Sequence, residues 1–484
     1  MKNLGSKDCD IAMECEDIYV DLDGTLIRTD LLFESTILLL KRNVFYIFLL
    51  PVWLAKGRAH LKNEIASRVA ISPETLPYNH EVLTYLDKKK KDGHRLLLAT
   101  ASNFRYAESV AEHLDIFDGV LASDRSTNLK SKAKLAAITR QNRPFSYLGD
   151  SEADYIIFQA SKLPVLVSSS RTIEKDASRH AGVDTVIPVP SAGNRDIIRC
   201  IRMYQWSKNL LLFVPLIVSG NLNQSSLFAD VSLTFLAFSL LASSTYILND
   251  IFDIQNDRQH PRKRFRAIPS GLLSVPRAVT LAFSLLLTAY AITGLAAPAA
   301  VPGLTAYLAL TLFYTYVVKS YVLMDVICLA ALYTARILIG AWVIAVEPSI
   351  WLLAFSMFLF VSLALVKRVS ELHTVKKEKQ SSSSGRDYNV SDTQLLVAMG
   401  AASAFNAVLV VTLYMAEGIQ NGGYHHPNLI WLVEPVLLYW LGRIWIKTTR
   451  GEMTDDPIVF SFRDKGSLVC AACIATIILG ALYL

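Results

Sequence analysis

The spacing of apolar residues changes near residue 193 and divides the chain into two parts. In the first part, residues 1–193, short apolar runs alternate with charged stretches of helical periodicity. Short runs that end in polar residues are typical of buried strands, and their alternation with helices predicts a parallel sheet covered by helices. We therefore expect an N-terminal α/β domain of Rossmann-like type, with strands in DIYVDLDGTL, RLLLATASN, FSYLGDSEAD and LPVLVSS.

In the second part, residues 194–484, the apolar runs are long. About 20 apolar residues cross the core of a bilayer as a helix, and nine runs approach that length. This part is therefore predicted to be an all-α polytopic membrane domain of about nine transmembrane helices, near residues 207–220, 230–248, 278–296, 299–318, 325–346, 350–366, 395–416, 429–446 and 467–484. The Pro, Ser and Gly content of IPVPSAGNRD, residues 187–196, predicts a short flexible linker between the parts.

Composition and charge agree with a membrane protein. Hydrophobic residues make up 52% of the chain, and the formal net charge of +6 gives no indication of a nucleic-acid partner. Lys and Arg stand in alternate connections between the long runs, and the positive-inside rule places such connections in the cytoplasm. We therefore expect a multi-pass protein of the inner (cytoplasmic) membrane, with the lipid bilayer as a partner and the N-terminal part in the cytoplasm. The sequence does not predict the oligomeric state.

Polar residues that follow the expected strands of the first part favour phosphoryl transfer. Asp21 and Asp23 follow the first strand, so one carboxylate can attack phosphorus while the other moves the proton. A single aspartate at a strand end is more often a helix cap, but further groups follow the later strands in order. A hydroxyl and an ammonium group can hold a phosphate, and two more carboxylates can hold Mg²⁺, a cation that prefers oxygen ligands. These groups belong to Thr100, Lys134 (or its neighbours Lys130 and Lys132), Asp150 and Asp154.

With these segments in this order, residues 16–190 resemble the haloacid dehalogenase (HAD) superfamily of phosphatases. The resemblance implies a nucleophile at Asp21, an acid/base at Asp23, and phosphate contacts from Thr100 and Lys134. It also implies a catalytic Mg²⁺ held by Asp21, Asp23, Asp150 and Asp154, and a helical cap formed by residues 31–90.

An apolar piece of this cap, residues 44–55, is too short to span a membrane. Two interpretations stay open for it. The piece can form part of a helix pair in the core of the cap, or it can rest in the membrane surface with neighbouring cations on lipid headgroups. The cations are Lys41, Arg42, Lys56 and Arg58.

The segment 246–271 combines carboxylates and cations at the end of a long apolar run. If the helix continues to Asp257, the carboxylates of Asp250, Asp253 and Asp257 lie on one face, with Asn249 beside them. Such a cluster is costly near lipid, and Mg²⁺ typically bridges carboxylates to substrate phosphates. The segment therefore predicts a diphosphate–Mg²⁺ site, whose other phosphate oxygens would contact Arg262, Lys263, Arg264 and Arg266.

NDIFDIQND within this segment matches the pattern N-D-x-x-D-x-x-x-D, by which residues 195–484 resemble the UbiA-type intramembrane prenyltransferase superfamily. The resemblance implies nine helices in a ring around a cavity that is open to the cytosol and to lipid. Aromatic prenyltransferases of this superfamily carry a second aspartate-rich segment between their fourth and fifth spans. Here that stretch offers one carboxylate, together with other polar groups: Tyr314, Lys319, Asp325 and Arg336.

One carboxylate is a poor second Mg²⁺ clamp, so the chain resembles more closely the branch that contains polyprenyl-phosphate phosphoribosyltransferases. Agreement also comes from QWSKN with Lys208 and Asn209, from LVKRVSEL with Lys367 and Arg368, and from RGEMTDDPIVFSFRD. The chain departs from that branch at Met203 and Ala267.

The resemblance implies a phosphorylated sugar donor, 5-phosphoribosyl 1-diphosphate, and a polyprenyl phosphate acceptor. Candidates to hold the lipid phosphate are Lys319, Arg336, Lys367 and Arg368. The HAD-like part would then remove the 5-phosphate of the transferred ribose. The alternative is a prenyltransferase that moves a polyprenyl group from its diphosphate to an aromatic acceptor. A transporter would leave both sets of motifs unexplained.

Overall fold

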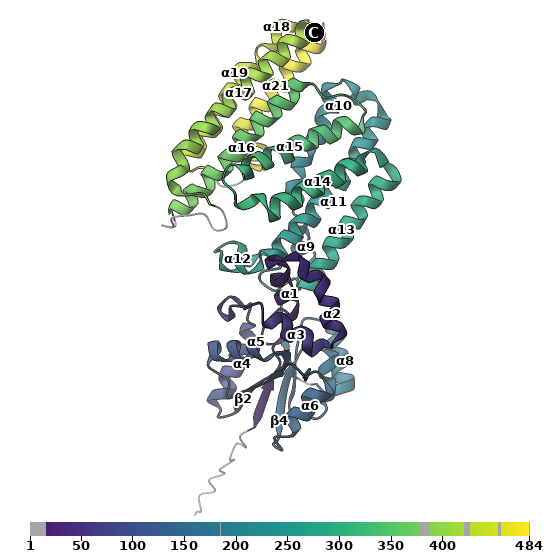
Figure 1. Cartoon of the computed structure of the whole chain (residues 1–484), viewed down its shortest axis with the longest axis vertical. Helices are drawn as coiled ribbons and strands as arrows, with labels where there is room; N and C mark the ends of the chain where they lie inside the picture. Colours follow the sequence, from purple (N-terminus) through teal and green to yellow (C-terminus); the bar gives the residue numbers. More distant parts are fainter. Residues whose placement is uncertain (1–15, 184, 378–386, 421–425, 454–455, 484) are drawn as a thin grey trace, which may run out of the picture. The chain divides into compact units, whose positions relative to one another are not determined.

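The structure is a computed structural model that describes residues 16–483 apart from 184, 378–386, 421–425 and 454–455 (Figure 1). Its contacts divide the chain into two compact units. Unit 1 contains Met1–Cys200 and Tyr246–Ala282, and unit 2 contains Ile201–Thr245 and Phe283–Leu484. The acidic segment of the membrane part therefore belongs, by its contacts, to the unit formed by the N-terminal residues.

A parallel sheet of six strands, in the order β3-β2-β1-β4-β5-β6, forms the centre of unit 1. Successive residues of β1 point to opposite faces, so Ile18 and Val20 enter one buried cluster while Tyr19 enters another. Both faces are buried because helices cover both, which is typical of parallel sheets. The strands are β1 (Asp17–Val20), β2 (Arg95–Asn103), β3 (Gly119–Ser123), β4 (Phe145–Gly149), β5 (Pro164–Ser168) and β6 (Thr185–Pro188).

The sheet fits the predicted α/β domain, and the four predicted strands are present as β1, β2, β4 and β5. Two strands, β3 and β6, were not predicted. The predicted linker is shorter than expected, because its first residues pair in β6 and its last ones open α9 (Asn194–Ile201). Pro and Ser content identified the exposed residues between these elements but not the edge strand beside them.

Short helices connect the strands of unit 1. They are α1 (Leu31–Arg42), η1 (Val44–Phe48), α2 (Leu49–Ala55), α3 (Arg58–Ala66), η2 (Pro73–Thr75), α4 (His80–Lys91), α5 (Phe104–Leu114), α6 (Lys132–Thr139), η3 (Glu152–Asp154), α7 (Tyr155–Phe158) and α8 (Arg171–Ala181). The helices from α1 to α3 enclose a small core of Leu39, Trp53 and Ile65, which is separate from the clusters on the sheet.

Helices also make up the second part of the chain. They are η4 (Met203–Phe213), α10 (Val214–Val218), η5 (Asn221–Asn223), α11 (Ser225–Phe252), α12 (Ile254–Gln259), η6 (Lys263–Phe265), α13 (Val275–Ala296), η7 (Pro298–Ala300), α14 (Val301–Tyr316), η8 (Val318–Ser320), α15 (Met324–Val343), α16 (Ile350–Lys377), η9 (Val390–Asp392), α17 (Thr393–Gln420), α18 (Pro427–Ile430), α19 (Val433–Thr449), α20 (Pro457–Arg463) and α21 (Lys465–Tyr483).

Among the described residues, six helices are long and apolar enough to cross a membrane, and a seventh span is possible if the bent pair α20–α21 counts as one. The predicted nine spans are therefore not confirmed. The first predicted span is divided between η4 and the five-residue α10, and the fourth corresponds to α14, which has 16 residues.

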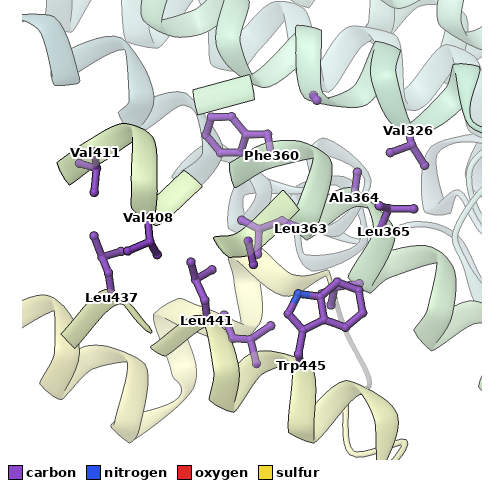
Figure 2. Packing of buried hydrophobic residues seen from close by; sticks show 14 of the residues in the cluster. Val326, Phe360, Leu363, Ala364, Leu365, Val408, Val411, Leu437, Leu441 and Trp445 are labelled. Carbon is purple, nitrogen blue, oxygen red and sulfur yellow. The ribbon is translucent and has the colours of Figure 1, made fainter. Parts of the chain in front are cut away.

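The largest apolar core lies in unit 2, where Figure 2 shows Phe360, Leu363 and Trp445 within it. Gly400 of α17 lets α19 approach closely, since a Cβ on it would lie 2.1 Å from the Trp445 ring. The indole N–H of Trp445 donates to Ser362 at 3.0 Å, so the ring has no unpaired polar atom in the apolar interior.

Candidate active sites

The candidate phosphoryl-transfer residues lie at the ends of three neighbouring strands, at one edge of the sheet in unit 1. Asp21 follows β1, Thr100 lies near the end of β2, and Asp150 follows β4. Because β1 pairs in parallel with both β2 and β4, these carboxyl ends meet at the same edge. We call the group of Asp21, Asp23, Thr100, Lys134, Asp150 and Asp154 the sheet-edge site.

Lys134 is the lysine that the structure places in the sheet-edge site. Its ammonium lies 3.0 Å from Asp21 and 3.7 Å from Asp154, with the side chain 3% exposed. It also donates to the Tyr147 hydroxyl at 2.8 Å, and that hydroxyl donates to Asp154 at 2.8 Å. Tyr147 was not predicted, because a tyrosine inside an apolar strand has no distinguishing sequence signal.

Three carboxylates of the sheet-edge site can share one metal ion. Among the described residues, Asp21, Asp150 and Asp154 form a group whose oxygens lie within 4.8 Å of one another. Gly24 permits this approach, because a Cβ at that position would lie 2.2 Å from an Asp150 oxygen. Burial and the nearby carboxylates raise the pKa of Asp150 well above its ordinary value. A divalent cation would offset that repulsion, so the residues fit the predicted Mg²⁺.

Asp23 lies apart from this carboxylate group and has different partners. It accepts hydrogen bonds from the Ser102 hydroxyl and, at 2.9 Å, from the Leu31 amide. Burial, together with the charge of Asp30, raises the pKa of Asp23 to about 7. A carboxyl group with such a pKa suits proton transfer near neutral pH. The geometry is therefore more consistent with its predicted acid/base role than with its predicted role as a metal ligand.

The insertion between β1 and β2 contributes a residue that was not predicted. Lys62 of α3 donates to the Ala101 carbonyl at 2.5 Å and to the Asn128 side chain at 3.0 Å. Ala101 directly follows Thr100 in β2. The helical insertion thus provides a cation beside the sheet-edge site.

The acidic segment is not one continuous helix, which corrects the prediction. Helix α11 ends at Phe252, and α12 begins at Ile254, with Asp253 between them. Asp250 and Asp257 still converge, because the Arg266 guanidinium bonds both carboxylates, at 3.1 and 2.9 Å. Carboxylate oxygens are the donor type that a divalent ion such as Mg²⁺ prefers, but among the described residues Asp250, Asp253 and Asp257 do not form a group of three whose oxygens lie within 4.8 Å of one another. The Asp253 carboxylate instead accepts a hydrogen bond from Lys41 of α1.

Two residues of α1 contact this acidic segment, all inside unit 1. The Lys41 ammonium donates to the Phe252 carbonyl at 2.9 Å and to Asp253 at 3.1 Å. The Glu34 carboxylate accepts two bonds from Arg258, at 2.9 and 2.5 Å, and both side chains are at most 4% exposed. Neither pair could be predicted from the sequence, because the partners are more than 200 positions apart.

The other predicted cations of the acidic segment lie on the loop after α12. Lys263 is 3.5 Å from Asp257, so it supports the same carboxylate as Arg266. Arg262 is exposed on this loop, so its guanidinium can contact a phosphate that approaches from solvent. These positions are compatible with the predicted phosphate contacts.

Two lysines from separate sequence motifs meet in unit 2. Lys208 of η4 and Lys367 of α16 both face Asp456, at 2.6 and 3.8 Å. Burial alone would raise the pKa of Asp456, but the two ammonium groups outweigh it and lower the pKa. Asp456, in the motif TDDP, is the residue missed here. We call these three residues the two-lysine cluster. It carries one net positive charge and suits an anion.

Arg336 and Arg368 have protein partners, which argues against their predicted role as phosphate holders. Arg336 donates to Asn209 at 2.9 Å and to the Tyr307 hydroxyl at 2.6 Å. Arg368 pairs with Asp325 and Glu371, each at 2.5 Å. Both arginines are buried. The partners of Arg368 are carboxylates, whereas the described partners of Arg336 are neutral hydrogen-bond acceptors.

Two other residues of the predicted set, Tyr314 and Lys319, lie on elements that precede α15 in the chain. The Tyr314 hydroxyl of α14 accepts a bond from Arg368 at 3.3 Å, while Lys319 lies on η8. Tyr388, which was not predicted, donates to Asp325 at 2.6 Å. Asp325 is therefore held by Arg368 and Tyr388, and it shares Arg368 with Glu371.

Comparison with known proteins identifies the second part. The profile of the UbiA prenyltransferase family matches residues 212–465, more than half of the 484 residues. The chain belongs to the UbiA prenyltransferase family. Membership in the UbiA family confirms the predicted transferase class, and with the apolar helices it confirms a multi-pass membrane protein.

Relatives of this UbiA-family chain differ in how much of it they cover. The uncharacterized protein y4nM of Sinorhizobium fredii is 36% identical over 473 residues, 95% of this chain and 90% of that protein. Nodulation protein NoeC of Azorhizobium caulinodans is 33% identical over 276 residues, 56% of this chain and 87% of NoeC. Decaprenyl-phosphate phosphoribosyltransferase of Mycobacterium tuberculosis is 31% identical over 198 residues, 40% of this chain and 66% of that enzyme.

Proposed function

We propose that this UbiA-family protein transfers 5-phosphoribose from 5-phosphoribosyl 1-diphosphate to a polyprenyl phosphate. The observation that carries the proposal is the set of contacts made by Asp325. This residue is the one carboxylate in the stretch that corresponds to the second aspartate-rich segment of aromatic prenyltransferases. Arg368 and Tyr388 already hold it, so it is poorly placed to clamp a second Mg²⁺ for a prenyl diphosphate. The 31% identity with decaprenyl-phosphate phosphoribosyltransferase supports the same choice of donor.

In the transfer step, the acceptor phosphate attacks the anomeric carbon and the bond from that carbon to the diphosphate breaks. Arg266 and Lys263 balance the charge on the departing diphosphate near the acidic segment. The two-lysine cluster holds an anionic phosphate through Lys208 and Lys367. Mg²⁺ would be bound by the carboxylates of the acidic segment and, separately, by those of the sheet-edge site, and would offset the charge of the phosphates at each.

We further propose that the N-terminal domain is a HAD-type phosphatase that removes the 5-phosphate from the lipid-linked product. Asp21 attacks phosphorus, and Asp23 donates a proton to the departing ribose oxygen. Water, deprotonated by Asp23, then releases inorganic phosphate from Asp21. Lys134 and Thr100 hold the phosphoryl oxygens during both steps. The product of the two activities is a polyprenylphosphoryl ribose.

Covalent linkage of the two activities has a kinetic reason. A short tether keeps the second site at roughly millimolar effective concentration near the first product. An aromatic product would give a sugar phosphatase no comparable role. The relative y4nM aligns over 95% of this chain, so it shares both parts.

Donor consumption by the purified full-length protein tests the proposed transfer. The protein in detergent with Mg²⁺ and polyprenyl phosphate should release diphosphate from 5-phosphoribosyl 1-diphosphate. A parallel reaction with a polyprenyl diphosphate and an aromatic acceptor should release none. Consumption of the prenyl donor alone would establish the aromatic alternative instead.

A further inference from the structure

An exposed apolar surface covers one side of the segment 44–54 in unit 1. Phe48 is 72% exposed, Phe45 is 70% exposed and Val44 is 62% exposed. The other large apolar side chains exposed in this segment are Ile47, Leu49, Val52 and Leu54. We call this set the cap apolar surface. Contiguous apolar exposure of this kind marks an interaction site.

The cap apolar surface is presented by folded structure. Trp53, on the opposite side of α2, is 7% exposed and packs with Leu39 and Ile65. The Arg68 guanidinium lies 4.9 Å from the centre of the Trp53 ring and covers it further. One side of η1 and α2 is thus fixed to the cap, which leaves the other side free to bind a partner. The packing of Trp53 agrees with the first sequence interpretation, a helix pair in the core of the cap, and the exposed side is compatible with the second, contact with the membrane surface.

Lys41 places the start of this surface beside a membrane helix. Its ammonium bonds the carbonyl of Phe252, the last residue of α11, at 2.9 Å. Helix α11 is one of the candidate spans, Ser225–Phe252. Val44 follows Lys41 by three residues, so the cap apolar surface begins close to the level at which that span ends.

Charge also favours a lipid partner. The segment 41–58 contains no Asp or Glu, and its four cations are exposed: Lys41, Arg42, Lys56 and Arg58. Apolar side chains flanked by cations are typical of helices that lie in the headgroup region of anionic bilayers. A symmetric contact between two copies would bring these like charges together, which disfavours a second copy as the partner.

We propose that η1 and α2 insert into the membrane surface through the cap apolar surface, with an anionic lipid bilayer as the partner. The insertion holds the cap of the N-terminal domain at the height of the lipid headgroups. If the proposed phosphatase role is correct, this position brings the sheet-edge site to a phosphate that is attached to a membrane lipid.

Lipid-attached quenchers test the insertion directly. The full-length protein, with its native cysteines replaced by serine, would carry Phe48→Cys labelled with a fluorescent probe, in nanodiscs that contain anionic lipid. Spin-labelled lipid should quench this probe at least about threefold more than a probe at Lys88→Cys, an exposed position on α4. Aqueous iodide should show the opposite preference.

Each outcome decides the proposal without any activity measurement. Quenching of the Phe48 probe by iodide, at the level seen for Lys88, would overturn it. Protection from both quenchers would also overturn it, because protein rather than lipid would then cover the surface.

A second variant tests the consequence for catalysis. Phe45→Asp with Phe48→Asp alters two exposed side chains, so the fold should be retained. We expect hydrolysis of a soluble sugar phosphate to stay unchanged while hydrolysis of a lipid-linked one falls about tenfold. Equal rates on the lipid-linked substrate would contradict the positioning effect. If wild type hydrolyses neither substrate, the phosphatase proposal fails, and the quenching result still decides the insertion.

Discussion

Asp21 is the residue on which the proposed second step depends. Its carboxylate lies 3.0 Å from Lys134 and within the group of three carboxylates at the sheet edge. We predict that Asp21→Asn stops release of inorganic phosphate and accumulates the phosphorylated lipid sugar, because an amide cannot attack phosphorus. Mass spectrometry of the lipid products measures this. If the variant forms the same lipid product as wild type, the two activities are not consecutive.

The proposed transfer step depends on Asp250, as the proposed phosphatase step depends on Asp21. It shares Arg266 with Asp257, and an amide at position 250 would remove one of the charges that can bind Mg²⁺. Asp250→Asn should therefore abolish diphosphate release, as excess chelator should in the wild type. Asp230→Asn, at the other end of α11, is the matched control and should retain activity. Transfer at the wild-type rate by Asp250→Asn would exclude this carboxylate from the site.

At the scale of elements, the position of η4 depends on close packing with α15. A Cβ on Gly340 would lie 2.1 Å from the backbone oxygen of Leu212, and a backbone atom cannot rotate away. The same η4 carries Lys208 and Asn209. Helix α15 therefore fixes where the two-lysine cluster forms.

We predict that Gly340→Ala destabilises the protein by about 2 kcal/mol, since overpacking forces a backbone shift. It should also lower transfer, because η4 moves with its lysine. Gly294→Ala in α13 is the control, as a Cβ there meets nothing within 4 Å. Thermal unfolding in detergent and the transfer rate measure both effects. Equal melting temperatures for the two variants would contradict the packing argument.

At the scale of the whole molecule, residues from α1 and from the acidic segment fold as one unit. Leu31 opens α1 and donates to Asp23 of the sheet-edge site, while Glu34 of the same helix pairs with Arg258. Arg258 directly follows Asp257 of the acidic segment. One short helix therefore contacts both groups of candidate catalytic carboxylates.

We predict that Glu34→Gln destabilises unit 1 by about 3 kcal/mol, because it leaves the buried Arg258 without its counter-charge. Transfer should fall although Glu34 lies outside the UbiA-matching residues. Combining the change with Arg258→Gln should cost less than the sum of the single changes. Glu81→Gln, an exposed carboxylate on α4, should have no effect. If the loss in free energy of unfolding of the double variant equals the sum of the two single losses, Glu34 and Arg258 are not coupled.

The sequence by itself determined the features that depend on local pattern. Alternating short apolar runs predicted β1, β2, β4 and β5, and polar residues after those runs predicted which side chains gather at the sheet edge. Long apolar runs predicted the membrane helices, although length alone did not show that the first would be divided between η4 and α10. Periodicity is readable because it reflects neighbours within a few residues.

Only the tertiary structure decided which charges pair. It selected Lys134 beside Asp21, engaged Arg368 with Asp325, and joined Glu34 to Arg258. It also showed that the apolar segment after α1 is exposed on one side. These results depend on contacts between residues 43 to 224 positions apart, or on the fold as a whole. Such contacts leave no periodic signal, because they arise when separate elements pack and their buried charges must find partners.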